Sequence, residues 1–161
     1  MFGTSEHALC SRCPNISIGR STVPIVRIDL SDRRGPEQRV AVSDGVHQAF
    51  VTAVGIPEGD KFHLITVHPS KDLRADPEYL GVHREDVIFV QVTLVRGRSS
   101  ETKTRLFRAI AENLARIDGV RAEDVCVVLT ENGPADYSWG NGEAQLLSLE
   151  SIPGVVTSAA D

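Results

Sequence analysis

Apolar residues are concentrated in four short, strand-like stretches, and the two longer stretches between them carry apolar residues at helical spacing. In the first stretch the side chains alternate between two faces, which is typical of a β-strand, whereas a spacing of three or four residues is typical of an amphipathic helix. The strand-like stretches are PIVRIDL (24–30), KFHLITV (61–67), VIFVQVTLV (87–95) and a fourth within DVCVVLT (124–130). The pattern therefore predicts strand, helix, strand, repeated once.

Each predicted helix begins and ends at residues that suit a helix terminus. Gly35 and Pro36 provide an N-cap and a first-turn proline for the first helix, and Gly55 ends it. A serine, Ser99 or Ser100, caps the second helix, and Gly119 closes it. The apolar stripes are Val42, Val46, Ala49, Phe50, Ala53 and Val54 in the first helix and Leu106, Ile110, Ala111, Leu114 and Ile117 in the second.

From residue 24 onward the chain repeats with a period of about 63 residues. Gly55 and Asp60 recur as Gly119 and Asp124, 64 positions further on. Two β-α-β units, about 24–85 and 86–147, each need a right-handed crossover that makes their strands parallel.

We therefore expect one α/β (α+β) domain over residues 24–161. Its predicted parts are a four-stranded, mainly parallel sheet with both helices on one face, a C-terminal hairpin, and a tail at 148–161. Because the helices leave the other face of the sheet unburied, we expect the protein to oligomerise.

Composition limits the classes of partner. The 161 residues are 41% apolar and 24% charged, as in a globular protein with one core. The net charge of −5 argues against a nucleic-acid surface, and no run approaches the ~20 apolar residues of a membrane span. We expect a cytoplasmic protein with neither nucleic-acid nor membrane partners.

The first 23 residues show no strand or helix period and lack the basic and apolar regions of a secretory signal. We expect residues 1–23 to be a disordered extension or to lie upstream of the true start. Valine 23 suits the second case, because a GTG valine codon also initiates translation in bacteria. The excess of Arg over Lys fits a GC-rich genome, and Met1 is the only methionine. Our hypothesis is that translation starts at Val23 and that Pro24 becomes the first residue.

The cysteines and histidines give little sign of a metal site. Cys10 and Cys13 form one C-x-x-C pair with no second pair, and Cys126 is predicted to be a buried thiol that packs as a small hydrophobe. Three of the five histidines fall at predicted strand ends or in a loop: His63, His68 and His83. We expect no metal and no organic cofactor.

Four polar or special residues flank the predicted strands and carry the candidate chemistry. Pro24 is inert within a chain, but at a free amino terminus its nitrogen is a secondary amine that takes up protons or attacks carbonyls. Arg96 and Arg98 follow a strand two residues apart, so in extended backbone they point the same way and can grip one carboxylate. Asp60 would act as a positioned acid or base. Singly, each has an ordinary reading: a proline opening an edge strand, two solvated charges, and a turn aspartate.

Four motifs together resemble one known family: PIVRIDL, GIPEGDKF, VTLVRGRSSETK and ENGPADYSWGNGEAQ. The chain resembles the tautomerase superfamily and, within it, the malonate semialdehyde decarboxylase group. The resemblance implies β-α-β repeats assembled as a homotrimer, with a catalytic proline at the mature amino terminus. It further implies the site roles: Pro24 as catalytic amine, Asp60 as its acid–base partner, Arg96 and Arg98 as a carboxylate clamp, and Tyr137, Trp139 and Leu146 as an apolar pocket wall.

The function implied is decarboxylation of a 3-oxo acid such as malonate semialdehyde by amino-terminal proline chemistry. Keto–enol tautomerisation of a 2-oxo acid is the enzymatic alternative. Phe62 stands where the 4-oxalocrotonate tautomerases carry an arginine, which disfavours that narrower activity. A third reading is a non-catalytic oligomer that binds anions and has a blocked proline.

Overall fold

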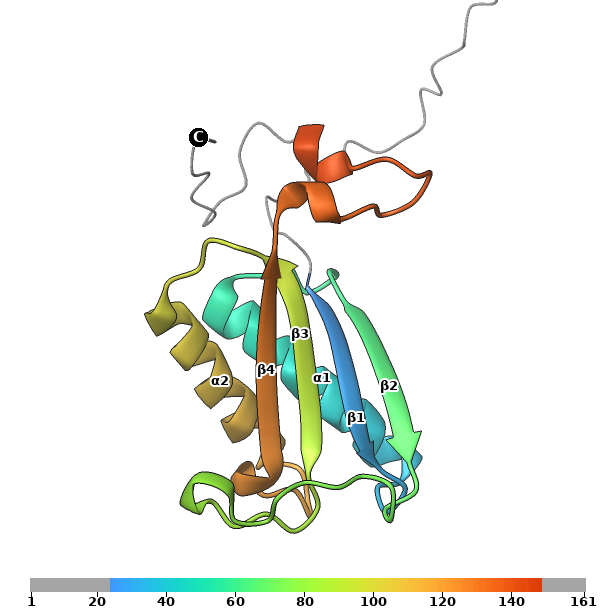
Figure 1. The fold of residues 1–161 in the computed structure, drawn as a ribbon, viewed down its shortest axis with the longest axis vertical. Helices are drawn as coiled ribbons and strands as arrows, with labels where there is room; N and C mark the ends of the chain where they lie inside the picture. The colour runs from blue at the N-terminus through green and yellow to red at the C-terminus, as the bar shows by residue number, and fades with distance from the viewer. Residues whose placement is uncertain (1–23, 149–161) are drawn as a thin grey trace, which may run out of the picture.

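Four strands form a single sheet, and two helices cover one of its faces (Figure 1). The computed structural model describes residues 24–148, so the predictions made for residues 1–23, including Cys10 and Cys13, and for nearly all of the tail lie outside the described residues. The elements are β1 (Ile25–Ser31), α1 (Pro36–Val54), β2 (Phe62–His68), β3 (Ile88–Val95), α2 (Ser100–Leu114) and β4 (Val125–Asn132). This is the predicted order of strands and helices.

The strand order is β2-β1-β3-β4, with β1 parallel to β2, β3 parallel to β4, and β1 antiparallel to β3. The mainly parallel sheet is thus confirmed, and the antiparallel pair joins the two repeats. Ile25 of β1 pairs with both Phe62 of β2 and Thr93 of β3. Because the repeats run in opposite directions, the residues that precede β1 and β2 and those that follow β3 and β4 gather at one end of the sheet.

Helix α1 has the predicted termini. Pro36 occupies the first turn, and the Gly35 N–H donates to the Gln38 side chain at 3.2 Å. Gly55 ends the helix with a φ of 80°, a left-handed conformation that favours glycine, and its N–H donates to Phe50 and Val51 carbonyls. The local sequence therefore determines where this helix starts and stops.

Helix α2 has the predicted start but ends earlier than predicted. Ser99 is the N-cap, and its Oγ accepts a hydrogen bond from the Thr102 N–H at 3.2 Å. The helix ends at Leu114, after which short-range bonds such as Val120 N–H to the Ile117 carbonyl form tight turns. Gly119, with a φ of 72°, closes these turns and not the helix itself.

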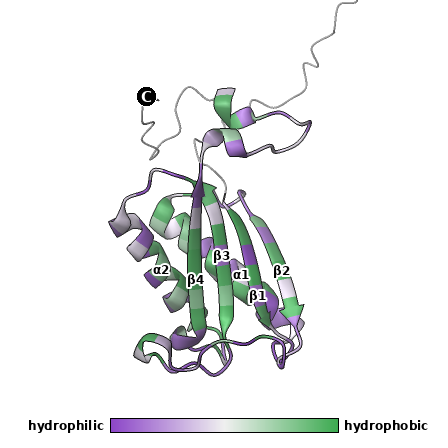
Figure 2. Ribbon diagram, in the orientation of Figure 1, coloured by the Kyte–Doolittle hydropathy of each residue, from purple (hydrophilic) through white to green (hydrophobic). Residues whose placement is uncertain are grey.

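The core lies between the sheet and the helices. The α1 stripe is buried as predicted except for Val54, which is only partly buried, and in α2 the stripe narrows to Leu106, Ile110 and Leu114. Figure 2 shows the hydrophobic positions running along the strands. The strand residues of this core are Val26, Ile28, Leu30, Ile88, Val90, Val92 and Leu94.

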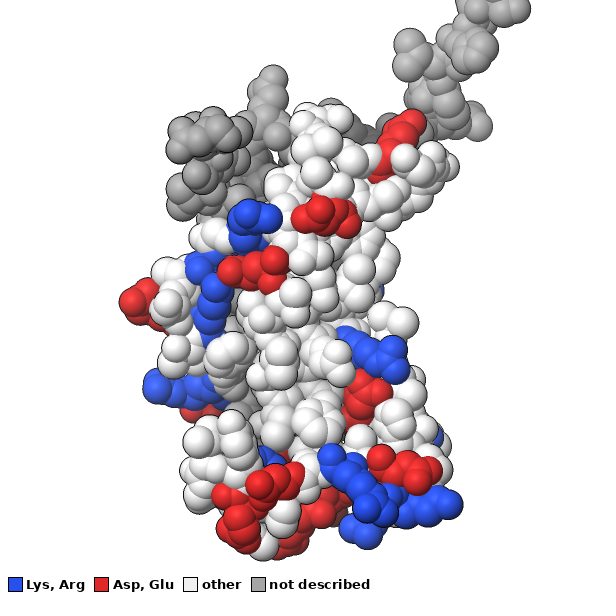
Figure 3. Space-filling view, in the orientation of Figure 1, with Lys and Arg blue, Asp and Glu red and all other residues white. Residues whose placement is uncertain are grey.

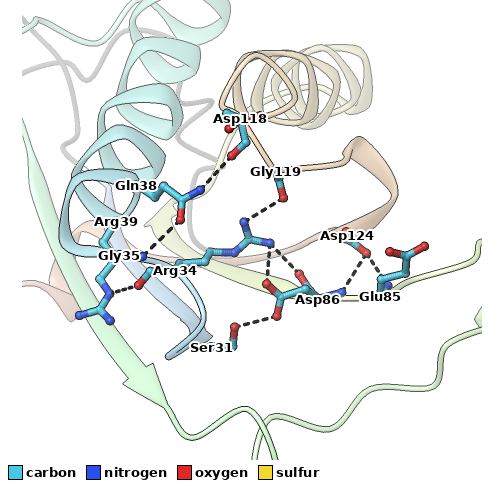
Figure 4. Close-up of polar contacts among 10 residues, drawn as sticks. All are labelled: Ser31, Arg34, Gly35, Gln38, Arg39, Glu85, Asp86, Asp118, Gly119 and Asp124. Atoms are coloured by element: carbon cyan, nitrogen blue, oxygen red, sulfur yellow. Dashed lines mark hydrogen bonds and ion pairs between the residues drawn. The ribbon is translucent and has the colours of Figure 1, made fainter.

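A buried arginine, Arg34, joins the two repeats at the end of the sheet where β1 ends and β3 begins (Figure 4). Arg34 forms an ion pair with the Asp86 carboxylate at 2.9 Å and donates to the Gly119 carbonyl at 3.3 Å. Ser31 Oγ donates to the same carboxylate at 2.7 Å, and Gln38 reaches the carbonyl of Asp118. This network fixes the end of β1 and the start of α1 against Asp86 and the segment that follows α2.

The sheet face away from the helices carries exposed apolar side chains. Leu64 on β2 is 53% exposed and Val128 on β4 is 58% exposed. In Figure 3 the centre of this face is largely uncharged, and most charged side chains lie toward its lower end and left edge, with a blue and red pair to the right of the centre and red side chains toward the top. Cys126 is half-buried, so the prediction of a buried thiol is wrong for the single chain, because its strand position puts it on this uncovered face.

The predicted C-terminal hairpin does not form within residues 24–148. Instead, two short 3₁₀ helices, Pro134–Asp136 and Gln145–Ser148, flank a loop. Asp136 accepts the Gly133 N–H at 2.6 Å, and Gln145 accepts the Trp139 N–H at 2.9 Å and donates to the Gly140 carbonyl at 2.8 Å. The chain reverses through these side-chain bonds, so no strand ladder is needed. Among residues 24–148, no helix of any kind is long and apolar enough to span a bilayer.

Candidate active site

Pro24 is buried and immediately precedes β1. The pairing of Ile25 with Thr93 directs the residue before it toward the end of β3, beyond which Arg96 lies. Strand pairing therefore holds Pro24 at the end of the sheet where the other candidate residues gather.

Asp60 lies at the same end, two residues before β2. It is half-buried, and its N–H donates to the Pro57 carbonyl at 3.0 Å, so it is part of a tight turn. Phe62, at the start of β2, pairs with Ile25, the residue after Pro24. The turn reading and the site reading of Asp60 are thus compatible.

Arg96 follows β3 and is exposed. Its N–H donates to the Asn132 carbonyl at 2.9 Å, which extends the pairing of β3 with β4 by one bond. Its guanidinium lies against Gly133, where an added Cβ would be 3.4 Å from Nη2. The absence of a side chain at position 133 leaves room for this guanidinium.

Arg98 is not in the extended relation to Arg96 that the spacing suggested. Gly97 between them has a φ of 121°, so the extended backbone ends with β3. Arg98 folds back, and its Nη1 donates to the Val95 carbonyl at 2.8 Å. Burial lowers the pKa of Arg98, while the charges of Glu131 and Tyr137 act in the opposite direction. Both guanidiniums therefore approach the segment 131–137, but by different routes.

Arg98 also borders a cavity of about 310 Å³ between the end of α1 and the start of α2. Thr102 and Arg105 line the same cavity, and Arg105 donates twice to the Ala53 carbonyl, at 3.2 and 2.9 Å. Arg98 thus lies at the boundary between the helix layer and the residues beyond β4.

The three predicted wall residues come together over the ends of β1 and β3. Tyr137 is buried and packs with Val95, and Trp139 and Leu146 are partly buried against this pair. The rings of Tyr137 and Trp139 stack with centroids 5.7 Å apart and an interplanar angle of 17°. This apolar cluster is separate from the core beneath the helices.

Two residues of this cluster were missing from the predicted wall. Ile25 packs against it, and the Phe62 ring lies 4.8 Å from the Trp139 ring, centroid to centroid. The sequence held a usable signal, because both residues open strands predicted to be parallel.

Within residues 24–148 no three His, Cys, Asp or Glu side chains are grouped so as to hold a metal.

Two family models, each described as tautomerase enzyme, match residues 24–83 and 60–140. Over 126 residues the chain is 36% identical to the probable tautomerase YusQ of Bacillus subtilis (strain 168), and the match covers 78% of this chain and 99% of YusQ. The chain belongs to the tautomerase superfamily. The superfamily predicted from the four motifs is thereby confirmed.

Among solved structures, this tautomerase-superfamily chain is similar to malonate semialdehyde decarboxylases. The FG41 enzyme inhibited by 3-bromopropiolate is 43% identical with a TM-score of 0.73, and the match covers 77% of this chain and 95% of that one. A second malonate semialdehyde decarboxylase is 31% identical with a TM-score of 0.71, over 77% and 96% of the two chains. A fused 4-OT described as a symmetric trimer, at 21% identity and a TM-score of 0.65 over 78% and 99%, shares the β-α-β-β-α-β fold.

Proposed function

We propose that this tautomerase-superfamily protein decarboxylates a short 3-oxo acid such as malonate semialdehyde, with Pro24 as an amino-terminal amine. The observation that carries the proposal is the gathering of Pro24, Asp60, Arg96, Arg98 and an aromatic wall at one end of the sheet. The 43% identity to a malonate semialdehyde decarboxylase supports the choice of substrate.

In this proposal Arg96 and Arg98 hold the substrate carboxylate. Guanidiniums bind carboxylates through charge-assisted hydrogen bonds. Arg98 is half-buried beside the apolar cluster of Tyr137 and Trp139. An apolar wall lowers the local dielectric, which strengthens such contacts and favours a small apolar-lined site.

The chemistry needs an electron sink at the 3-oxo group. The bond between the carboxylate carbon and C2 breaks, carbon dioxide leaves, and the electron pair moves toward the carbonyl. A cationic Pro24 would stabilise the resulting enolate by charge, and C2 would then take up a proton to give acetaldehyde. A neutral Pro24 would instead add to the carbonyl and lose water to form an iminium. Loss of carbon dioxide from the iminium gives an enamine, which takes up a proton at C2, and water then hydrolyses the resulting iminium to acetaldehyde and free Pro24.

Either route requires a free nitrogen on Pro24, and therefore a chain that begins there. Two observations support this part of the proposal. One family match begins at residue 24, and one related decarboxylase was studied with alanine in place of proline at its first residue. Asp60, in the adjacent turn, would position water or exchange a proton with the substrate.

We propose further that the protein assembles as a homotrimer through the open face of the sheet. The exposed apolar side chains of Leu64 and Val128 support burial of that face. The fused 4-OT described as a symmetric trimer has the same fold, although at 21% identity. The location we propose is cytoplasmic.

Two parallel assays on a chain that begins at Pro24 test the function. One measures carbon dioxide release from malonate semialdehyde, and the other measures loss of the enol of a 2-oxo acid, the activity that the name of YusQ favours. Arg96→Ala should lower carbon dioxide release at least tenfold. Full activity in that variant would rule out the carboxylate clamp, and enol loss without decarboxylation would identify a tautomerase instead.

A further inference from the structure

The hydroxyl of Tyr137 is buried and has no hydrogen-bond partner within residues 24–148. The residue is only 6% exposed, and its ring packs with Val95 in the apolar cluster. A buried polar group without a partner destabilises a protein, and native structures rarely keep one unless it has another role. A phenylalanine would fill the same space without this penalty, so the hydroxyl calls for an explanation beyond packing.

The surroundings of Tyr137 hold its ring in place. Trp139 stacks on it almost in parallel, and Trp139 is itself held by its backbone bond to Gln145 and by the ring of Phe62. Val95, the residue before Arg96 in the sequence, packs against Tyr137. A donor held rigidly in this way loses little freedom when it binds a ligand.

The hydroxyl also lies in the field of a positive charge. Burial and the Asp136 carboxylate raise the pKa of Tyr137, and the Arg98 charge acts against them. The phenol therefore stays protonated at neutral pH and is able to donate a hydrogen bond. Its neighbour Arg98 is one of the two residues proposed to bind the substrate carboxylate.

We propose that the Tyr137 hydroxyl donates a hydrogen bond to the carbonyl oxygen of the bound oxo acid while Arg98 contacts the carboxylate. The inference rests on the proposed function of this site. In a short oxo acid the two groups are separated by at most one carbon, so adjacent protein groups reach both. During decarboxylation the carbonyl oxygen gains negative charge, and a fixed donor stabilises that charge more than it stabilises the ground state. Tyr137 keeps its proton throughout.

The test compares binding of two acids that differ at the carbonyl. Pyruvate and propionate have the same carbon skeleton, and only pyruvate has a carbonyl oxygen beside the carboxylate. Their dissociation constants are measured by calorimetry for the full chain, for Tyr137→Phe and for Tyr79→Phe. Tyr79 is the matched control because it is the other tyrosine and is 60% exposed.

We expect the unchanged chain to prefer pyruvate, and Tyr137→Phe to reduce that preference about 5- to 20-fold without weakening propionate binding. The stability of Tyr137→Phe toward urea should be equal to or higher than that of the unchanged chain, and Tyr79→Phe should change nothing. An unaltered preference in Tyr137→Phe would overturn the inference, whether or not the variant changes oligomeric state. Failure of the unchanged chain to bind either acid would overturn it as well.

These outcomes separate the inference from the proposed function. A Tyr137-dependent preference for pyruvate in a protein that releases no carbon dioxide from malonate semialdehyde would support the hydroxyl and refute the decarboxylase. Decarboxylation together with a preference for pyruvate that Tyr137→Phe leaves unchanged would support the decarboxylase and refute the role of the hydroxyl.

Discussion

The ring of Phe62, which opens β2, lies 4.8 Å from the ring of Trp139, which follows β4, measured between centroids. The two rings are tilted by 48° and connect the outer strand of the first repeat to the segment that follows the second. Trp139 also stacks on Tyr137. Trp139 thus contacts both other rings of the aromatic wall, Phe62 and Tyr137.

Trp139→Ala should therefore disturb the wall more than the fold. Aromatic pairs of this kind contribute about 0.5–1.5 kcal/mol each beyond area burial, so loss of the two pairs alone should lower the free energy of unfolding by about 1–3 kcal/mol, and the lost burial of the ring adds to this. The Michaelis constant for the oxo acid should rise several-fold. Urea unfolding and steady-state kinetics measure the two effects, and Trp139→Phe, which keeps a ring, is the control. Unchanged kinetics in the alanine variant would contradict the assignment of the wall.

Gly133→Ala should displace the Arg96 guanidinium. A Cβ at position 133 would lie 3.3 Å from Asp136 Oδ2, which accepts the Gly133 N–H, and 3.4 Å from Arg96 Nη2, so both side chains are crowded and both can move away with little loss of stability. We expect kcat/KM for the oxo acid to fall about 5- to 20-fold while the free energy of unfolding changes by less than about 0.5 kcal/mol.

Gly45→Ala is the control for this substitution. Gly45 lies within α1, and a Cβ added there would be 3.8 Å from the Cβ of Asn113 in α2, which is ordinary van der Waals contact. That change should leave kcat/KM unaltered and raise stability by about 0.5–1 kcal/mol, because glycine weakens a helix interior. Equal kinetic effects from the two alanines would argue against a role for the Arg96 position.

Arg34→Met should destabilise the protein by about 3 kcal/mol, because it leaves the Asp86 carboxylate without its buried guanidinium partner. In a protein that already carries Arg34→Met, Asp86→Asn should lower the free energy of unfolding by less than it does in the unchanged protein. Urea unfolding of the two single variants and the double variant gives the coupling free energy. Arg33→Met, at an exposed neighbouring position, should have little effect. Strictly additive losses would mean that the ion pair does not stabilise the fold.

His63 should make stability depend on pH between about 4 and 6.5. Burial lowers the pKa of His63 from 6.5 to about 4, with smaller contributions from Lys61 and His47. As pH falls through this range, the unfolded chain takes up a proton that the folded chain does not, so stability falls. We expect a loss on the order of 1–2 kcal/mol, allowing for partial exposure of the ring.

Unfolding free energies at pH 7 and pH 4.5 measure this dependence. His63→Asn, whose amide can keep the hydrogen bond that Ser43 forms with Nδ1 at 2.9 Å, should remove most of it. An equal pH dependence in both proteins would show that other groups are responsible.

The sequence predicted the order of strands and helices and named candidate residues, but that these residues gather at one end of the sheet follows from the strand pairing. Local signals sufficed for α1, because Pro36 and Gly55 specify its termini. Two repeats, each with parallel strands, brought Pro24 and Asp60 together through pairing alone.

What the sequence did not predict depends on backbone conformations and side-chain contacts that residue spacing does not specify. The relation between Arg96 and Arg98 changes because Gly97 takes a positive φ, and spacing alone does not reveal that conformation. The loop after β4 is held by the side chains of Asp136 and Gln145, so its Gly-rich sequence was misread as a hairpin. Phe62 joins the wall only once β2 is placed beside β1.

The central claim is that the nitrogen of Pro24 is the catalytic amine, and the most direct test adds one residue to it. Two chains are compared, one beginning at Pro24 and one beginning at Val23, each verified by intact mass. Val23 converts the amine into an amide and changes little else. We expect the first chain to release carbon dioxide from malonate semialdehyde and the second to be at least a hundredfold slower. Equal rates from the two chains would contradict the claim.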